Sequence, residues 1–184
     1  MDINTAIKSR RAYRALDPVE ITEDMILTLG AAAKLAPSCF NNQPWRFVFV
    51  YEKETLTALW DALSPANGWV KDASLIVAVF SRADMDCRIN EREYYLFDTG
   101  IATGFMILQA EELNLVMHPI AGYNPDIVKN TLGIPGDMNV ITLLAAGKHA
   151  ETAGTPEREK YLEKDRTRPE RKTIEEILFR NRFE

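Results

Sequence analysis

Cationic side chains gather close to the N-terminus of the chain. Four of the residues from 8 to 14 are cationic, namely Lys8, Arg10, Arg11 and Arg14. A guanidinium group is planar and can donate two parallel hydrogen bonds to phosphate oxygens, and this spacing lets several such groups converge on one phosphate. The cluster therefore indicates a phosphate site, although a cluster of this kind taken alone is more often a solvated basic turn.

A second group of cations lies near the other end of the chain, at Arg166, Arg168 and Arg171. It precedes a capping-box sequence from Thr173 to Glu176, which predicts that a last helix begins there. A charged tail of this type is usually a solvated face.

Three side-chain amides, Asn41, Asn42 and Gln43, follow Pro37 and precede an aromatic and β-branched run over residues 45–50. Pro37 ends the preceding helical pattern, and the run predicts a buried strand. A loop with rigid flanks and free hydrogen-bonding groups often carries function. The alternative is that the amides only make local turn contacts.

The sequence Ala-Pro-Ser, a short spacer, Asn and Gln-Pro-Trp-Arg-Phe over residues 36–47 resembles the FMN-dependent nitroreductase family. Three further segments match that family in the same order along the chain: residues 10–14, 98–100 and 169–176. The resemblance implies that arginines from both ends of the chain bind the FMN phosphate, with Arg171 the foremost candidate in the C-terminal segment.

The resemblance also implies where the flavin ring lies. Pro37, Ser38 and Cys39 would approach it from a partner subunit, the amides would face its pyrimidine edge, and the backbone after Ile120 would lie against the ring. The implied cofactor-binding residues are Arg10, Arg11, Ala12, Arg14, Pro37, Ser38, Cys39, Asn41, Gln43, Asn67, Ala121, Gly122, Arg168 and Arg171. Ala12 departs from a serine that is common in the family. Ala121 stands where many classical members have glutamate, so the substrate range does not carry over.

The implied activity is that of an oxidoreductase that uses NADH or NADPH and reduces a nitro, quinone or other small acceptor. The sequence has no glycine-rich dinucleotide fingerprint, because Gly100 and Gly104 lie within a helical pattern. A nicotinamide donor would therefore dock transiently, and no catalytic side chain is required. The alternatives are a flavin-binding protein with a specialised role and an interaction domain without a cofactor.

The chain has 184 residues and a formal net charge of −5. This length predicts one domain over residues 1–184, and the negative charge argues against nucleic acid as a main partner. The two cysteines, Cys39 and Cys87, show no pairing pattern or metal spacing, which predicts a cytoplasmic protein. The first residues have no signal-peptide character, and neither histidine lies in a metal motif.

Helices are predicted over residues 2–9, 22–35, 53–63, 91–114 and 124–133 and after residue 173, and strands over residues 45–50, 74–80, 116–121 and 140–146. Residues 147–155 are predicted to be an exposed loop. This succession indicates an α+β fold, with a mixed sheet of about four strands and helices on both faces.

The segment from Tyr94 to Leu113 is apolar nearly all round, which is typical of a helix buried on most sides. A domain of this size has little room to cover one helix so fully, so we expect a homodimer in which this long helix forms the interface. The alternative is a central helix within one subunit. Asp98, Gln109, Glu111 and Glu112 interrupt the segment, which excludes a membrane span.

Overall fold

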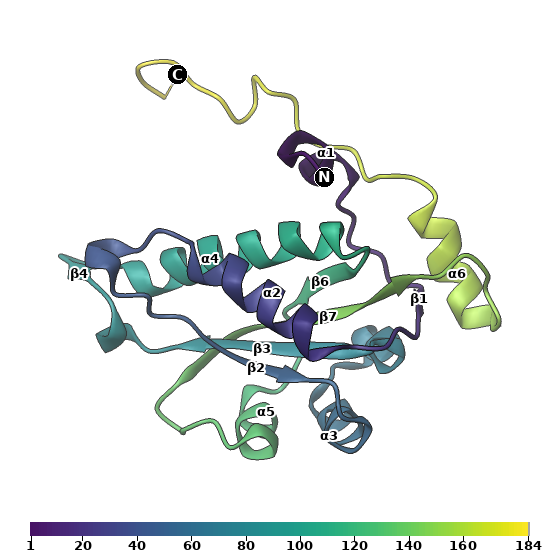
Figure 1. Cartoon of the computed structure of the whole chain (residues 1–184). Coiled ribbons are helices and arrows are strands. Elements are labelled where there is room, and N and C mark those ends of the chain that lie inside the picture. The colour runs from purple at the N-terminus through teal and green to yellow at the C-terminus, as the bar shows by residue number, and fades with distance from the viewer. Residues whose placement is uncertain (184) are drawn as a thin grey trace.

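The protein is an α+β fold built on a five-stranded sheet (Figure 1). A computed structural model describes residues 1–183 of the chain. The sheet has the order β1-β7-β3-β2, and β6 also pairs with β7. The strands are β1 (Leu16–Asp17), β2 (Arg46–Val50), β3 (Leu75–Ser81), β6 (Val116–Ile120) and β7 (Asn139–His149), and a separate hairpin is formed by β4 (Arg88–Ile89) and β5 (Arg92–Glu93). Every pairing within the described residues is antiparallel, whereas the sequence predicted a mixed sheet.

Most of the predicted helices are present. The helices are α1 (Ile3–Ser9), α2 (Glu23–Lys34), α3 (Lys53–Leu59), α4 (Tyr94–Glu112), α5 (Pro125–Leu132) and α6 (Pro156–Asp165), with short 3-10 helices η1 (Cys39–Asn41), η2 (Trp60–Ala62), η3 (Pro65–Asp72) and η4 (Ala83–Met85). Local chemistry sets their ends: the Thr22 hydroxyl accepts the Met25 N–H at the start of α2, and the Asn124 side chain caps α5. Gly133 ends α5 in the left-handed conformation.

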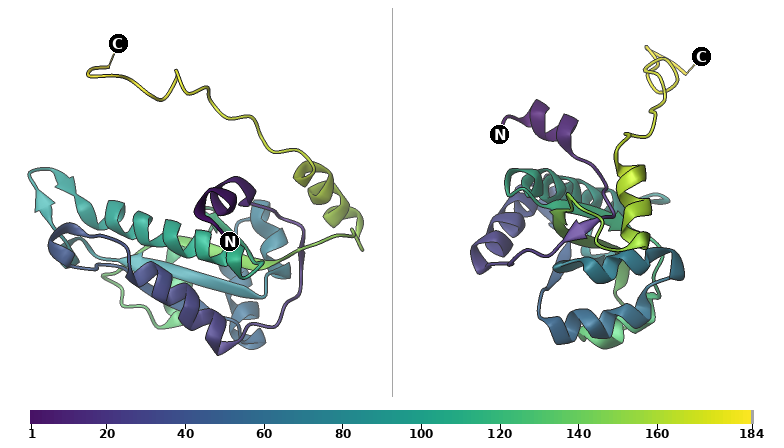
Figure 2. Two further views of the ribbon diagram at one scale, coloured as in Figure 1. Left: turned by 45° about the horizontal axis from the view of Figure 1, so that its top comes forward. Right: turned by 90° about the vertical axis from the view of Figure 1, so that its right-hand side faces the viewer.

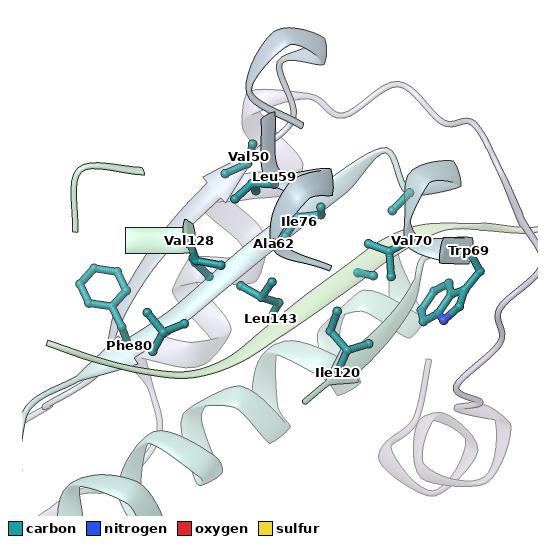
Figure 3. Close-up of a cluster of buried hydrophobic side chains, with 14 of the residues drawn as sticks. Val50, Leu59, Ala62, Trp69, Val70, Ile76, Phe80, Ile120, Val128 and Leu143 are labelled. Carbon is teal, nitrogen blue, oxygen red and sulfur yellow. The ribbon is translucent and has the colours of Figure 1, made fainter. Parts of the chain in front are cut away.

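Two hydrophobic layers cover the sheet, and β3 contributes to both by strict alternation. Leu75, Val77 and Val79 pack against α2 and α4 on one face. Ile76, Ala78 and Phe80 point to the opposite face, where α3 and α5 supply Leu59 and Val128 (Figure 3). Because successive strand residues face opposite sides, this apolar strand is buried throughout. The predicted helical cover on both faces is confirmed.

The segment that follows β7 differs from the prediction. No helix begins at Thr173: its N–H does donate to the Glu176 carboxylate over 2.7 Å, but the segment forms turns. Its apolar side chains Ile174, Ile177 and Leu178 are exposed, and a short helix without a packed face is marginal in water. The tail extends from α6 past α1 and away from the sheet (Figures 1 and 2). Helix α6 was not predicted.

Helix α4 is covered on one side only. Ala102, Met106 and Ala110 are fully buried against the sheet and α2, whereas Phe97 keeps 64% of its surface exposed and Phe105 keeps 41%. Part of the nearly continuous apolar pattern from Tyr94 to Leu113 therefore lies on a solvent-exposed face of α4. Among the described residues, no helix has the length and apolar character needed to cross a membrane.

Candidate functional site

The two ends of the chain meet around one cavity of about 490 Å³. Its cationic lining residues are Arg10, Arg11, Arg14, Lys164, Arg168 and Arg171, and Ala12 also lines it. The lining includes one carboxylate, that of Asp165. The cavity is thus strongly electropositive in a chain whose formal net charge is −5.

Two arginines hold the ends together reciprocally. Arg11 Nη2 donates to the carbonyl oxygens of Asp165 (3.0 Å) and Thr167 (2.9 Å), at the C-terminal end of α6. Arg168 Nη2 donates to the carbonyl oxygens of Lys8 (2.6 Å) and Arg10 (2.7 Å), at the C-terminal end of α1. Each guanidinium therefore caps a helix end on the other segment, where the last carbonyls lack intrahelical partners.

The Asp165 carboxylate holds the N-terminal segment in place through two backbone contacts. Its Oδ2 accepts the backbone N–H groups of Arg14 (3.2 Å) and Ala15 (3.3 Å). Because these are charge-assisted contacts to backbone, they orient residues 14–15 rather than neutralise an arginine side chain.

Three of the cavity's guanidinium groups have no hydrogen-bond or ion-pair partner among the described residues. Within residues 1–183, the side chains of Arg10, Arg14 and Arg171 make no hydrogen bond or ion pair. Like charges held near one another repel, so this arrangement favours an anion that can accept hydrogen bonds from several of them. A phosphate dianion has the charge and the oxygen atoms to do so.

His118, on β6, lines the same cavity. Its Nδ1 lies 3.1 Å from the Tyr13 carbonyl oxygen, which can only accept, so Nδ1 carries the proton. Burial lowers the pKa of His118, and the positive charges of Arg14 and Arg10 lower it further, while the Tyr13 carbonyl and Asp165 oppose them. His118 is therefore a neutral side chain near pH 7.

Acidification is expected to destabilise the fold through His118. Its pKa is lower in the folded chain than the usual 6.5, so the unfolded chain binds a proton first as the pH falls. The free energy of unfolding should decrease from about pH 7 to about pH 5, as measured by urea denaturation. His118→Gln should flatten this slope without abolishing it, since burial also lowers the pKa of His149. An unchanged slope in the variant would contradict this assignment.

Asn67 and Gly122 form a contact close to this cavity. Asn67 Nδ2 donates to the Gly122 carbonyl oxygen over 2.9 Å, and Trp69 on the same 3-10 helix packs against His118 with ring centroids 4.6 Å apart. A Cβ at residue 122 would lie 2.5 Å from Ser64 Oγ. A side chain at residue 122 would therefore displace the Ser64 and Asn67 side chains. The Asn67 amide already has a partner within the chain. Ala121 is exposed beside this contact.

The amide loop over residues 37–43 has an unusual backbone. Phe40, Asn41 and Gln43 adopt φ angles of 47°, 59° and 50°, in the left-handed region that non-glycine residues seldom occupy. Ser38 Oγ accepts the Gln43 N–H over 2.9 Å and stabilises the turn. Gln43 also donates from Nε2 to the Asn41 carbonyl oxygen, so this side-chain amide is already hydrogen-bonded within the loop.

A disulfide joins Cys39 to Cys87, although the sequence shows no pairing pattern for them. The two residues are 48 positions apart and carry no spacing signal, because their pairing depends on the tertiary approach of the loop to the segment before β4. The cytoplasmic location stays a prediction. Its argument, the missing pairing pattern, loses its force because the two cysteines form a disulfide.

Asp98, in the first turns of α4, anchors the same loop. Its Oδ2 accepts the Cys39 N–H over 2.6 Å, and the residue is only 3% exposed. Burial raises the pKa of Asp98, the Cys39 N–H opposes this, and the neighbouring Asp86 carboxyl raises it again.

The predicted site residues therefore fall into separate groups. The arginines and Ala12 share one cavity near α1 and α6, and the Asn67–Gly122 contact lies beyond His118. The group from Pro37 to Gln43 lies near β4 and the start of α4, away from α6 (Figure 1). One copy of the chain does not bring the amide loop to the arginines.

Five residues that line the cavity were not among the predicted cofactor-binding residues: His118, Tyr161, Lys164, Asp165 and Pro169. Three of them lie on α6, whose start carries a readable signal. The Thr155 hydroxyl accepts the Arg158 N–H over 3.2 Å, and Pro156 and Glu157 follow it as in many helix starts. His118 had no sequence signal beyond its position in a strand.

A family model described as the nitroreductase family matches residues 7–67 and 64–148. The chain belongs to this family. A relative from Thermus thermophilus named NADH dehydrogenase is 25% identical over 182 residues, covering 82% of this chain and 88% of the relative.

Solved nitroreductase-like structures share the fold. A structure titled as an oxidoreductase containing FMN is 26% identical with a TM-score of 0.83, covering 100% of this chain and 94% of its own. A nitroreductase family protein from Clostridium difficile 630 is 25% identical with a TM-score of 0.79, and the match covers 100% of both chains. The nitroreductase fold predicted from the sequence is thereby confirmed.

Proposed function

We propose that this protein is an FMN-dependent oxidoreductase that takes electrons from NADH or NADPH. The observation that carries the proposal is the meeting of arginines from both ends of the chain around one cavity. Family membership and a structural neighbour titled as an oxidoreductase containing FMN support it. Arg10, Arg14 and Arg171 would hold the phosphate, because their guanidinium groups have no partner among the described residues.

The other arginines act by positioning. Arg11 and Arg168 are engaged with backbone carbonyl oxygens, so they fix the two segments that carry the phosphate-binding side chains. Neutral His118 adds a wall to the cavity without adding charge. A pocket arranged before the ligand arrives loses less entropy on binding than a flexible one.

A homodimer completes the proposed site. The apolar face of α4 that carries Phe97 and Phe105 is exposed in one chain. The amide loop also lies apart from the arginine cavity within that chain. A two-fold dimer through α4 would account for both observations, with Pro37, Ser38 and Cys39 from the partner subunit facing the ring. Asn41 and Gln43 would read the pyrimidine edge of the flavin through their amide and backbone groups.

A bound flavin would supply the redox chemistry, with hydride accepted from the nicotinamide at a ring nitrogen and electrons then passed from the ring to a nitro, quinone or other small acceptor. No side chain of this chain is assigned as an acid or base. The protein binds the phosphate, orients the ring and leaves room for a nicotinamide donor and then for the acceptor.

The test is spectroscopic and kinetic. We expect a yellow purified protein, or one that binds added FMN, and oxidation of NADH or NADPH with a quinone such as menadione. A yellow protein without turnover with either nucleotide would favour the alternative of a specialised flavin-binding protein. A colourless protein that takes up no FMN would refute the proposed function.

A further inference from the structure

Two cysteine sulfurs and a carboxylate gather where the amide loop meets the segment before β4. Sγ of Cys39, Sγ of Cys87 and a carboxylate oxygen of Asp86 all lie within 4.8 Å of one another. Asp98 borders this group, because it accepts the Cys39 N–H and its carboxyl interacts with that of Asp86. These residues come from three separate segments of the chain.

Asp86 has an uncompensated oxygen in this group. Its Oδ2 is buried and accepts no hydrogen bond within the described residues. The other oxygen, Oδ1, accepts the Asn42 side-chain amide over 3.2 Å, and the same amide donates to Cys87 Sγ over 3.4 Å. A buried carboxylate oxygen normally finds a donor or a cation, whereas the Asp86 carboxyl has a second carboxyl, that of Asp98, as its neighbour. A cation between these groups would compensate both.

We propose that the reduced form of this group is a binding site for a zinc-like divalent cation. Cys39, Cys87 and Asp86 are the ligands, and Asp98 or a water molecule takes the fourth position. Thiolates together with a carboxylate suit the borderline softness of zinc better than they suit magnesium or calcium. Asn42 is a positioning residue, since its amide contacts two of the three ligands.

The disulfide and the cation exclude each other. A dithiol reductant transfers two electrons and two protons to the Cys39–Cys87 disulfide and becomes a disulfide itself; the cation then displaces the two thiol protons. A tetrahedral zinc ion with Zn–S bonds of about 2.3 Å needs its sulfurs about 3.8 Å apart. The Cα atoms are 6.0 Å apart, so rotation of the side chains can provide this separation. Either state ties the amide loop to the segment before β4.

The experiment is zinc binding by the whole purified protein in its two redox states. The protein is reduced with a phosphine, freed of reductant, dialysed against Zn²⁺ and analysed by atomic emission. We expect about one zinc per chain in the reduced protein and none in the oxidised protein. Bound zinc should also protect both cysteines from alkylation, as read by mass spectrometry.

Matched variants identify the ligands. Cys87→Ser should abolish the site, and Asp86→Asn and Asn42→Ala should each weaken zinc binding by about 10- to 100-fold. Asp84→Asn is the control, because Asp84 lies in the preceding turn and pairs with Arg82 instead. Circular dichroism checks that each variant is folded. Asp86→Asn retains both cysteines, so it stays informative if Cys87→Ser does not fold.

Several results would overturn the proposal. Equal zinc binding by oxidised and reduced protein would show that the thiols are not ligands. Equal zinc binding by the reduced wild type and the reduced Asp86→Asn variant would exclude Asp86 as a ligand. A proton shared between the Asp86 and Asp98 carboxyls would then explain the buried oxygen. The proposal is independent of FMN, since neither outcome depends on flavin binding or turnover.

Discussion

Arg171→Ala is expected to weaken FMN binding by about 1.5–3 kcal/mol, or about 10- to 150-fold in the dissociation constant. Arg171 lines the arginine cavity, and its guanidinium has no hydrogen bond or ion pair within residues 1–183. Its removal therefore deletes a charge-assisted phosphate contact without breaking a contact that holds the fold. The measurement is the quenching of FMN fluorescence on titration with the apoprotein.

The double variant Arg10→Ala/Arg171→Ala should bind FMN more weakly than either single variant. The two residues come from opposite ends of the chain, so this loss tests their convergence on one anion directly. Arg166→Ala is a matched control: Arg166 lies at the end of α6 but does not line the cavity, and the dissociation constant should stay the same. A double variant that binds FMN like the wild type would exclude this cavity as the phosphate site.

Phe97→Arg is expected to convert the proposed dimer to a monomer. Phe97 is 64% exposed on the open side of α4, where Leu96 and Phe105 are also exposed. An unpaired charge at the centre of an apolar interface costs about 3–5 kcal/mol, which is enough to dissociate a dimer at micromolar concentration. Sedimentation velocity measures the change.

The monomer should also lose FMN, because the amide loop and the arginine cavity lie apart within one chain. Asn130→Arg places the same charge on α5, which packs on the opposite face of the sheet, and should leave both properties intact. If Phe97→Arg sediments as the wild type does, the proposed interface through α4 is wrong. A monomer that still binds FMN tightly would show that one chain contains the whole site.

Much of the fold was predictable because its signals are local. The caps at Thr22 and Asn124, the helix end at Gly133 and the continuous apolar run of β3 each act within a few residues. The convergence of Arg11 and Arg171 was predictable only through family resemblance, since no local pattern joins residues so far apart.

The failures have tertiary causes. The tail after Thr173 has a helix-start signal but no surface to cover its apolar side chains in this chain. Cys39 and Cys87 pair across 48 residues, and His149 belongs to β7 and stacks on Tyr13, with ring centroids 3.7 Å apart, instead of lying in an open loop. In each case the outcome depends on what the rest of the chain places next to the residue.

The clasp formed by Arg11 and Arg168 has a consequence for biosynthesis. A ribosome makes the arginines beside α1 before any strand of the sheet, and Arg168 and Arg171 only after the last strand and α6. A nascent polypeptide can fold its sheet before that point but has only half of an anion pocket. Flavin loading should therefore follow the synthesis of Arg171, and a ribosome-stalled chain that ends before Arg168 should emerge without the cofactor.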